Sequence, residues 1–121
     1  MAIDLETHHG DHREILRREA SGAELAAFAG AGLTEWDSLT MIWAAKESLA
    51  KVLRTGLMAP LSFYEVGSVE RAAGDGVICA YRHFAQYKSY CAILGHLAVA
   101  ITLPRKSVLQ LDWRAIPVEP R

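Results

Sequence analysis

An unbroken run of good helix-forming residues extends from Glu35 to Arg54. Thr34 precedes this run as a suitable N-cap residue, and Gly56 follows it as a residue typical of helix ends. We therefore expect one long helix over residues 35–54. After Pro60 the pattern changes to segments rich in β-branched and aromatic residues, which predict strands. The chain thus has to place strands against one long helix.

The residues before the long helix predict one strand and two short helices. Segment 2–6 alternates apolar with acidic residues, which is the period of a strand and places Asp4 and Glu6 on one face. Segments 10–19 and 21–28 each begin with a capping residue that is followed three positions later by a glutamate. The capping pairs are Asp11 with Glu14 and Ser21 with Glu24.

The second half of the chain predicts an antiparallel meander. The expected strands cover residues 62–66, 77–84, 87–94 and 97–103, with 108–113 as a candidate edge strand. Gly95 and His96 have the character of a tight hairpin turn between the last two main strands. The order of a strand, helices and then a meander indicates an α+β fold, and the length suits a single domain over 1–121.

Composition excludes several classes of function. A net charge of −1 gives no overall field that would attract nucleic acid or anionic lipid, and no apolar run is long enough to cross a membrane. Cys79 and Cys91 are typical of core residues in a reduced, cytoplasmic protein. A hydrophobic content of 51% is high for so small a domain, so we expect another chain to cover part of the apolar surface.

Charged residues interrupt the apolar pattern of the long helix. Glu47 and Lys51 are one helical turn apart, and on an exposed face such a pair contributes only ~0.2–0.5 kcal/mol. Glu47 also shares its sector of the helix with Trp36 and Trp43, which predicts partial burial. A half-buried carboxylate requires a nearby cation, either a lysine or a bound metal ion.

Asp4 and Glu6 make a bound metal ion a candidate for that cation. Together with Glu47 they form a set of three carboxylates, the hard oxygen ligands that Mg²⁺ prefers alongside water and substrate phosphates. Lys46 and Lys51 would then neutralise those phosphates. The residues alone leave an ordinary ion pair and a magnesium site both open.

Two segments resemble the signature motifs of the 4′-phosphopantetheinyl transferases, A-I-D-L-E at 2–6 and W-A-A-K-E-S-L-A-K at 43–51. The family's second motif, [WF]-x-x-K-E-[AS]-x-x-K, is matched at every position, whereas Ala2 replaces the usual glycine of the first. The resemblance covers Ala2 to Leu103. It implies the family's fold and its activity, the transfer of the phosphopantetheine arm of coenzyme A to a serine of an acyl or peptidyl carrier protein, with Mg²⁺ on the pyrophosphate.

Motif positions imply roles for individual residues. Asp4, Glu6 and Glu47 correspond to the metal ligands of the family. Lys51 corresponds to a residue that contacts the phosphates of coenzyme A, and Lys46 to one that lines the same site. Glu47 and Lys51 would therefore both serve catalysis.

Two further residues have less specific support. Glu24 matches a glutamate that helps to deprotonate the attacking serine in the surfactin-type (two-domain) members, but its capping pair with Ser21 explains it equally well. His8 lies close to Glu6 along the chain, which allows it to approach a bound phosphate.

The size of the chain bears on its assembly. Surfactin-type members have another half before the first motif, whereas the length here matches the holo-acyl-carrier-protein synthase type, which trimerises and builds its sites between protomers. We therefore expect a homo-oligomer, a dimer or a trimer. The alternative is a noncatalytic remnant that binds coenzyme A or a carrier protein, or a half that needs a separate partner chain.

Overall fold

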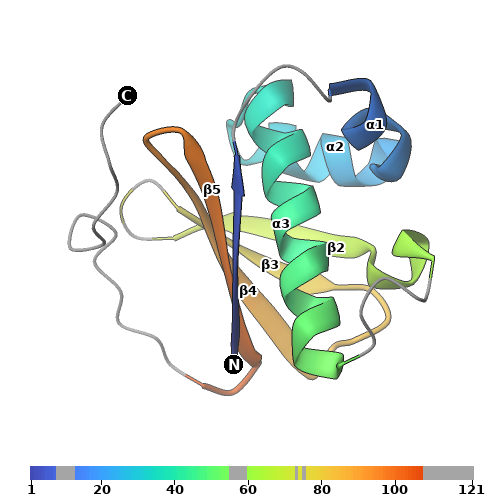
Figure 1. Ribbon diagram of the computed structural model, residues 1–121, viewed down its shortest axis with the longest axis vertical. Helices are drawn as coiled ribbons and strands as arrows, with labels where there is room; N and C mark the ends of the chain where they lie inside the picture. Colours follow the sequence, from blue (N-terminus) through green and yellow to red (C-terminus); the bar gives the residue numbers. More distant parts are fainter. Residues whose placement is uncertain (8–12, 55–59, 73, 75, 108–121) are drawn as a thin grey trace.

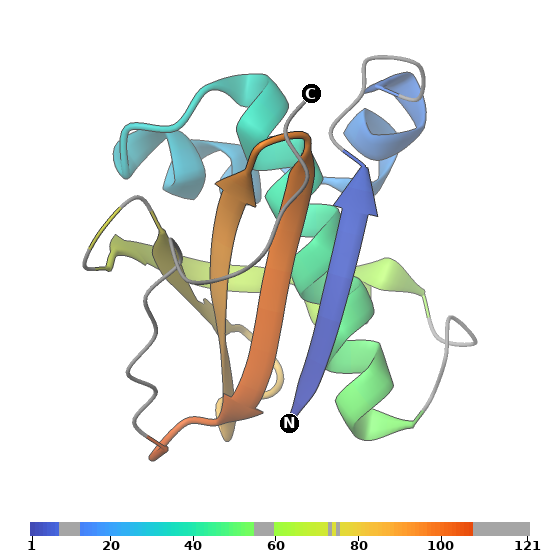
Figure 2. The same ribbon diagram turned by 60° about the vertical axis from the view of Figure 1, so that its left-hand side comes forward.

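The computed structural model describes residues 1–7, 13–54, 60–72, 74 and 76–107. Within these residues a five-stranded antiparallel sheet packs against three α-helices. Figures 1 and 2 show how these elements are arranged. The predicted α+β fold is therefore confirmed. The elements in chain order are β1 (Ala2–Thr7), α1 (Arg13–Glu19), α2 (Gly22–Gly30), α3 (Glu35–Leu53), the 3-10 helix η2 (Leu61–Tyr64), β2 (Val66–Arg71), β3 (Val77–Tyr81), β4 (Tyr87–Leu94) and β5 (Leu97–Pro104).

The sheet is a meander to which the first strand has been added. Its order is β1-β5-β4-β3-β2, so the N-terminal strand pairs with the last strand and forms one edge. The register places Asp4 opposite Ala100 and Glu6 opposite Ala98. The predicted turn between β4 and β5 is confirmed, with Gly95 at a φ of 61° that glycine adopts without strain.

Helix α3 lies along the sheet beside β1, as both ribbon views show. The hydroxyl of Thr34 accepts a hydrogen bond from the backbone N–H of Asp37, which confirms the predicted start of the helix. The helix ends at Leu53, and Arg54 takes the left-handed conformation (φ 58°) that follows many helices. Gly56, the expected terminating residue, lies outside the described residues.

The core between α3 and the sheet contains many small side chains. Ala44 and Ala45 of α3 and Ala98 and Ala100 of β5 are completely buried in the same cluster as Phe28. Because these side chains are short, the helix backbone can lie close to the strand. This close packing brings side chains of β1 and α3 within reach of one another.

The opposite face of the sheet is also apolar. Ile101 and Val99 of β5 belong to a second cluster, and the register places Ile3 and Leu5 beside them on β1. Ile3 and Leu5 are 51% and 56% exposed. The alternation predicted for segment 2–6 is therefore confirmed, with acidic residues towards α3 and apolar residues on the other side.

The strand prediction for residues 62–66 is wrong. Residues 61–64 form a 3-10 turn after Pro60, in which the N–H of Phe63 donates to the Pro60 carbonyl and Tyr64 is buried in the core. The real strand, β2, starts at Val66 and was not predicted, because its residues are mostly polar and exposed.

Strand boundaries elsewhere also differ from the predictions. Strand β3 ends at Tyr81, several residues before the predicted end at residue 84. Asp11, the expected cap of α1, and segment 108–113 lie outside the described residues. Within the described ranges, no helix is both long enough and apolar enough to cross a membrane.

Candidate functional site

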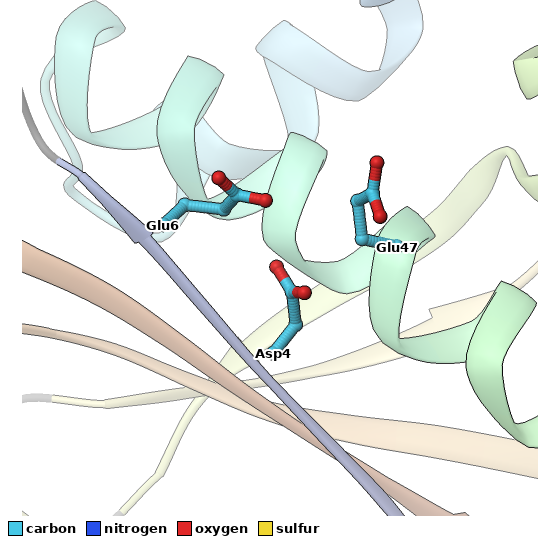
Figure 3. A group of neighbouring side chains, drawn as sticks. All are labelled: Asp4, Glu6 and Glu47. Atoms are coloured by element: carbon cyan, nitrogen blue, oxygen red, sulfur yellow. The ribbon is translucent and has the colours of Figure 1, made fainter.

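Three carboxylates meet between β1 and α3. Asp4 and Glu6 extend from the strand towards the helix, and Glu47 lies on the facing side of α3, as Figure 3 shows. Each offers one oxygen, and these oxygens all lie within 4.8 Å of one another. The three residues that the motifs singled out as metal ligands are thus brought together by the fold.

Hydrogen bonds from α3 hold the strand in place. Ser48 Oγ donates to the carbonyl oxygen of Ala2 at 3.1 Å. Lys51 Nζ forms an ion pair with Asp4 Oδ1 at 2.6 Å and donates to the Ile3 carbonyl at 3.3 Å. The ammonium group of Lys51 therefore reaches across to the strand, instead of forming the helical pair with Glu47 that the spacing allowed.

The carboxylates disfavour one another's charge. Burial, followed by the neighbouring Asp4 carboxylate, raises the pKa of Glu6 to about 7. Burial and the charge of Asp4 also raise the pKa of Glu47. The hydrogen bond to Asp4 raises the pKa of Lys51, so this lysine stays protonated. A second source of positive charge would relieve this repulsion.

The donor set fits a hard divalent cation. Asp4 is 4% exposed, and its Oδ2 atom is buried without a hydrogen-bond partner, which is costly for a carboxylate oxygen. Glu6 and Glu47 supply further carboxylate oxygens beside it, and both are only partly buried. A set of three carboxylates, two of them partly open to solvent, suits Mg²⁺, which keeps several waters and binds few protein carboxylates.

Lys46 and Glu24 form a separate pair. Lys46 Nζ lies 3.0 Å from Glu24 Oε1 and donates to the Glu19 carbonyl, and both side chains are almost completely buried. Glu24 also accepts from the backbone N–H groups of Ser21 and Val66, each at 2.8 Å. Its predicted capping box with Ser21 is confirmed.

This buried pair lines a surface hollow of its own. The hollow has a volume of about 310 Å³, and its other lining residues include Ser21, Ser62 and Glu65. The residues that line it do not include Asp4, Glu6 or Glu47. Lys46 and Lys51 are therefore directed to different partners, although both belong to the second motif.

The sequence interpretation missed one member of the site. Trp43 Nε1 donates to Glu6 Oε1 at 3.0 Å, so this tryptophan contacts the cluster through a polar group. The signal was its place one turn before Glu47 on the same sector of the helix. His8, which was expected to approach a phosphate, lies outside the described residues.

Comparison with known proteins agrees with this geometry. The family model described as the 4′-phosphopantetheinyl transferase superfamily matches residues 1–102, which include β1, α3 and all three carboxylates. None of the curated proteins gives a match to the chain. On the strength of the family match, the chain belongs to the 4′-phosphopantetheinyl transferase superfamily.

Proposed function

We propose that this protein transfers 4′-phosphopantetheine from coenzyme A to a serine of an acyl or peptidyl carrier protein, with Mg²⁺ as the cofactor. The observation that supports this most is the convergence of Asp4, Glu6 and Glu47, which come from the two family motifs. In the proposed reaction, the serine oxygen forms a bond to the pantetheine phosphorus. The pyrophosphate bond breaks, and adenosine 3′,5′-bisphosphate leaves.

The three carboxylates would hold the metal ion, which supplies positive charge to the pyrophosphate when it is bound. Lys51 is the lysine best placed to contact a phosphate, because its side chain is 51% exposed beside Asp4. Lys46 would first have to leave its buried pair with Glu24. We therefore assign phosphate binding to Lys51 and a structural role to Lys46.

Glu24 is proposed mainly as a structural residue. Its carboxylate already accepts hydrogen bonds from Ser21, Lys46 and Val66, and its side chain is 1% exposed. A base that deprotonates serine must reach the hydroxyl directly or through one water. A folded Glu24→Gln variant that keeps its activity would remove Glu24 from the catalytic residues, and loss of activity would restore it.

The activity is tested by mass spectrometry with the purified protein, coenzyme A, Mg²⁺ and a panel of apo-carrier proteins. We expect a carrier to gain the mass of phosphopantetheine, and we expect Glu47→Gln to lose at least ~100-fold in rate, as removal of a charge-stabilising group does. Glu35→Gln, which changes an exposed glutamate of the same helix, is the matched control. Absence of any gain with folded protein would contradict the proposal and favour a noncatalytic role in binding coenzyme A or a carrier.

A further inference from the structure

Trp43 makes a polar contact that packing alone does not require. Its indole N–H is its one hydrogen-bond donor, and it points to Glu6 Oε1 at 3.0 Å. The carboxylate of Glu6 is only partly buried, so water could have served as its donor instead. The contact therefore holds one oxygen of Glu6 against Trp43 of α3.

Asp4 is held in a comparable way. Lys51 of α3 holds its Oδ1 atom, whereas its Oδ2 atom is buried and has no hydrogen-bond partner. Both strand carboxylates thus have one oxygen bonded to a donor from α3. Holding one oxygen of a carboxylate is a way in which neighbouring groups orient metal ligands.

We propose that Trp43 is a positioning residue that orients Glu6 for the divalent cation of the site. The inference rests on the magnesium site of the proposed function. Trp43 acts through Glu6 and needs no contact with the metal or the substrate. Because the indole is neutral, it holds the carboxylate without neutralising the negative charge that a cation requires.

A rigid donor suits this task. Glu6 has a long side chain on an edge strand, and holding it still costs conformational entropy whenever a ligand binds. A tryptophan that is already anchored in α3 reduces that cost before binding. Phenylalanine would fill much of the same space but could not donate, so Trp43→Phe separates orientation from packing.

The first measurement is the affinity of the protein for Mn²⁺, which is monitored by electron paramagnetic resonance. Mg²⁺ is then added as a competitor. We expect Trp43→Phe to weaken binding by roughly 10-fold, the lower end of the effect of removing such a neighbouring group. Trp36→Phe is the matched control, because Trp36 lies in the same helix with its ring under Arg13. We expect that variant to bind as tightly as the wild type.

A second measurement uses the unaltered residue and does not depend on the stability of Trp43→Phe. In a proton–nitrogen correlation spectrum, the indole N–H resonance of Trp43 should shift when Mg²⁺ is added to the wild-type protein. In Glu6→Ala the same resonance should move to the position of a free indole and no longer respond to Mg²⁺.

The outcomes separate the two proposals. If the wild-type protein binds neither Mn²⁺ nor Mg²⁺, the metal site of the proposed function and this inference both fail. The wild-type protein could instead bind the metal ion while Trp43→Phe binds it equally well, or while the indole resonance does not shift at saturating Mg²⁺. In either case only the role of Trp43 fails.

Discussion

The charge of Glu6 depends strongly on its surroundings. Burial and the nearby Asp4 carboxylate raise its pKa to about 7, while the hydrogen bond from Trp43 acts in the opposite direction. In the free protein, Glu6 is therefore partly protonated near neutral pH. A metal ligand must be deprotonated, so binding at this site should release a proton.

This pKa predicts how stability depends on pH. A folded-state pKa above the ordinary value of 4.5 means that the folded protein binds more protons than the unfolded chain between pH 4.5 and about 7. The contribution of Glu6 to stability should therefore fall as the pH rises through this window. When the pH is raised from about 5 to about 8 in the absence of metal, the melting temperature of Glu6→Gln should therefore fall less than that of the wild type.

Thermal melts across the pH range, with a chelator present, check this prediction. Glu35→Gln serves as the control, because Glu35 is exposed and paired with Arg17. Identical pH dependence in the wild type and Glu6→Gln would show that Glu6 has no raised pKa.

At the scale of residues, the motifs predicted a cluster of three carboxylates, whose role as a metal site stays a prediction. Asp4, Glu6 and Glu47 do lie together in the fold. Strand alternation places Asp4 and Glu6 on one face, and the resemblance to the family motifs adds Glu47 to them. The partners of Lys46 and Trp43 could not be predicted in the same way. Both partners lie in other elements, so only the packing of α3 against its neighbours determines them.

At the scale of elements, Glu24 connects two helices and a strand. It lies in the first turn of α2, pairs with Lys46 of α3 and accepts from the backbone of Val66 at the start of β2. Removing its charge leaves a buried ammonium group without a counter-ion. We expect Glu24→Gln to lower the free energy of unfolding by about 3–5 kcal/mol.

Urea denaturation measures this loss, and Glu35→Gln again supplies the comparison. Glu35 and Arg17 form an ion pair whose side chains are 53% and 49% exposed, and such pairs contribute at most about 1 kcal/mol. A loss from Glu24→Gln as small as that from Glu35→Gln would show that the buried pair does not connect the elements as proposed.

The elements themselves were predictable to different degrees. Helix α3 was predicted to within one residue at its C-terminal end, because it has clear caps and no internal glycine or proline. Strand β2 was missed because an edge strand can carry Gly67, Ser68 and Glu70, residues that propensity assigns to turns. Its position depends on pairing with β3, which a local pattern does not contain.

For the whole molecule, the exposed apolar side of β1 supports the expected oligomer. Ile3 and Leu5 lie at the edge of the sheet, directly behind the carboxylate cluster, and are 51% and 56% exposed. We propose that a second copy covers them, as a dimer or a trimer would. The double substitution Ile3→Ser and Leu5→Ser should then shift the protein to a lower mass.

Sedimentation velocity over a dilution series measures this shift. Phe63→Ser is the matched control, since Phe63 is 55% exposed but lies in η2, away from β1 in the chain. A wild-type protein that remains monomeric at every concentration would contradict the prediction, as would an unchanged mass in the double variant.

The alternation of β1 has a consequence for insertions and deletions. Asp4 and Glu6 face α3 only because one residue separates them, and Leu5 fills that place on the other face. One extra residue between them would turn a carboxylate outward and an apolar side chain inward, since each step along a strand reverses the face. Two extra residues would keep both carboxylates on the face towards α3 but would move them apart along the strand. A protein that uses this pair of carboxylates therefore has to keep the spacing of one residue between them.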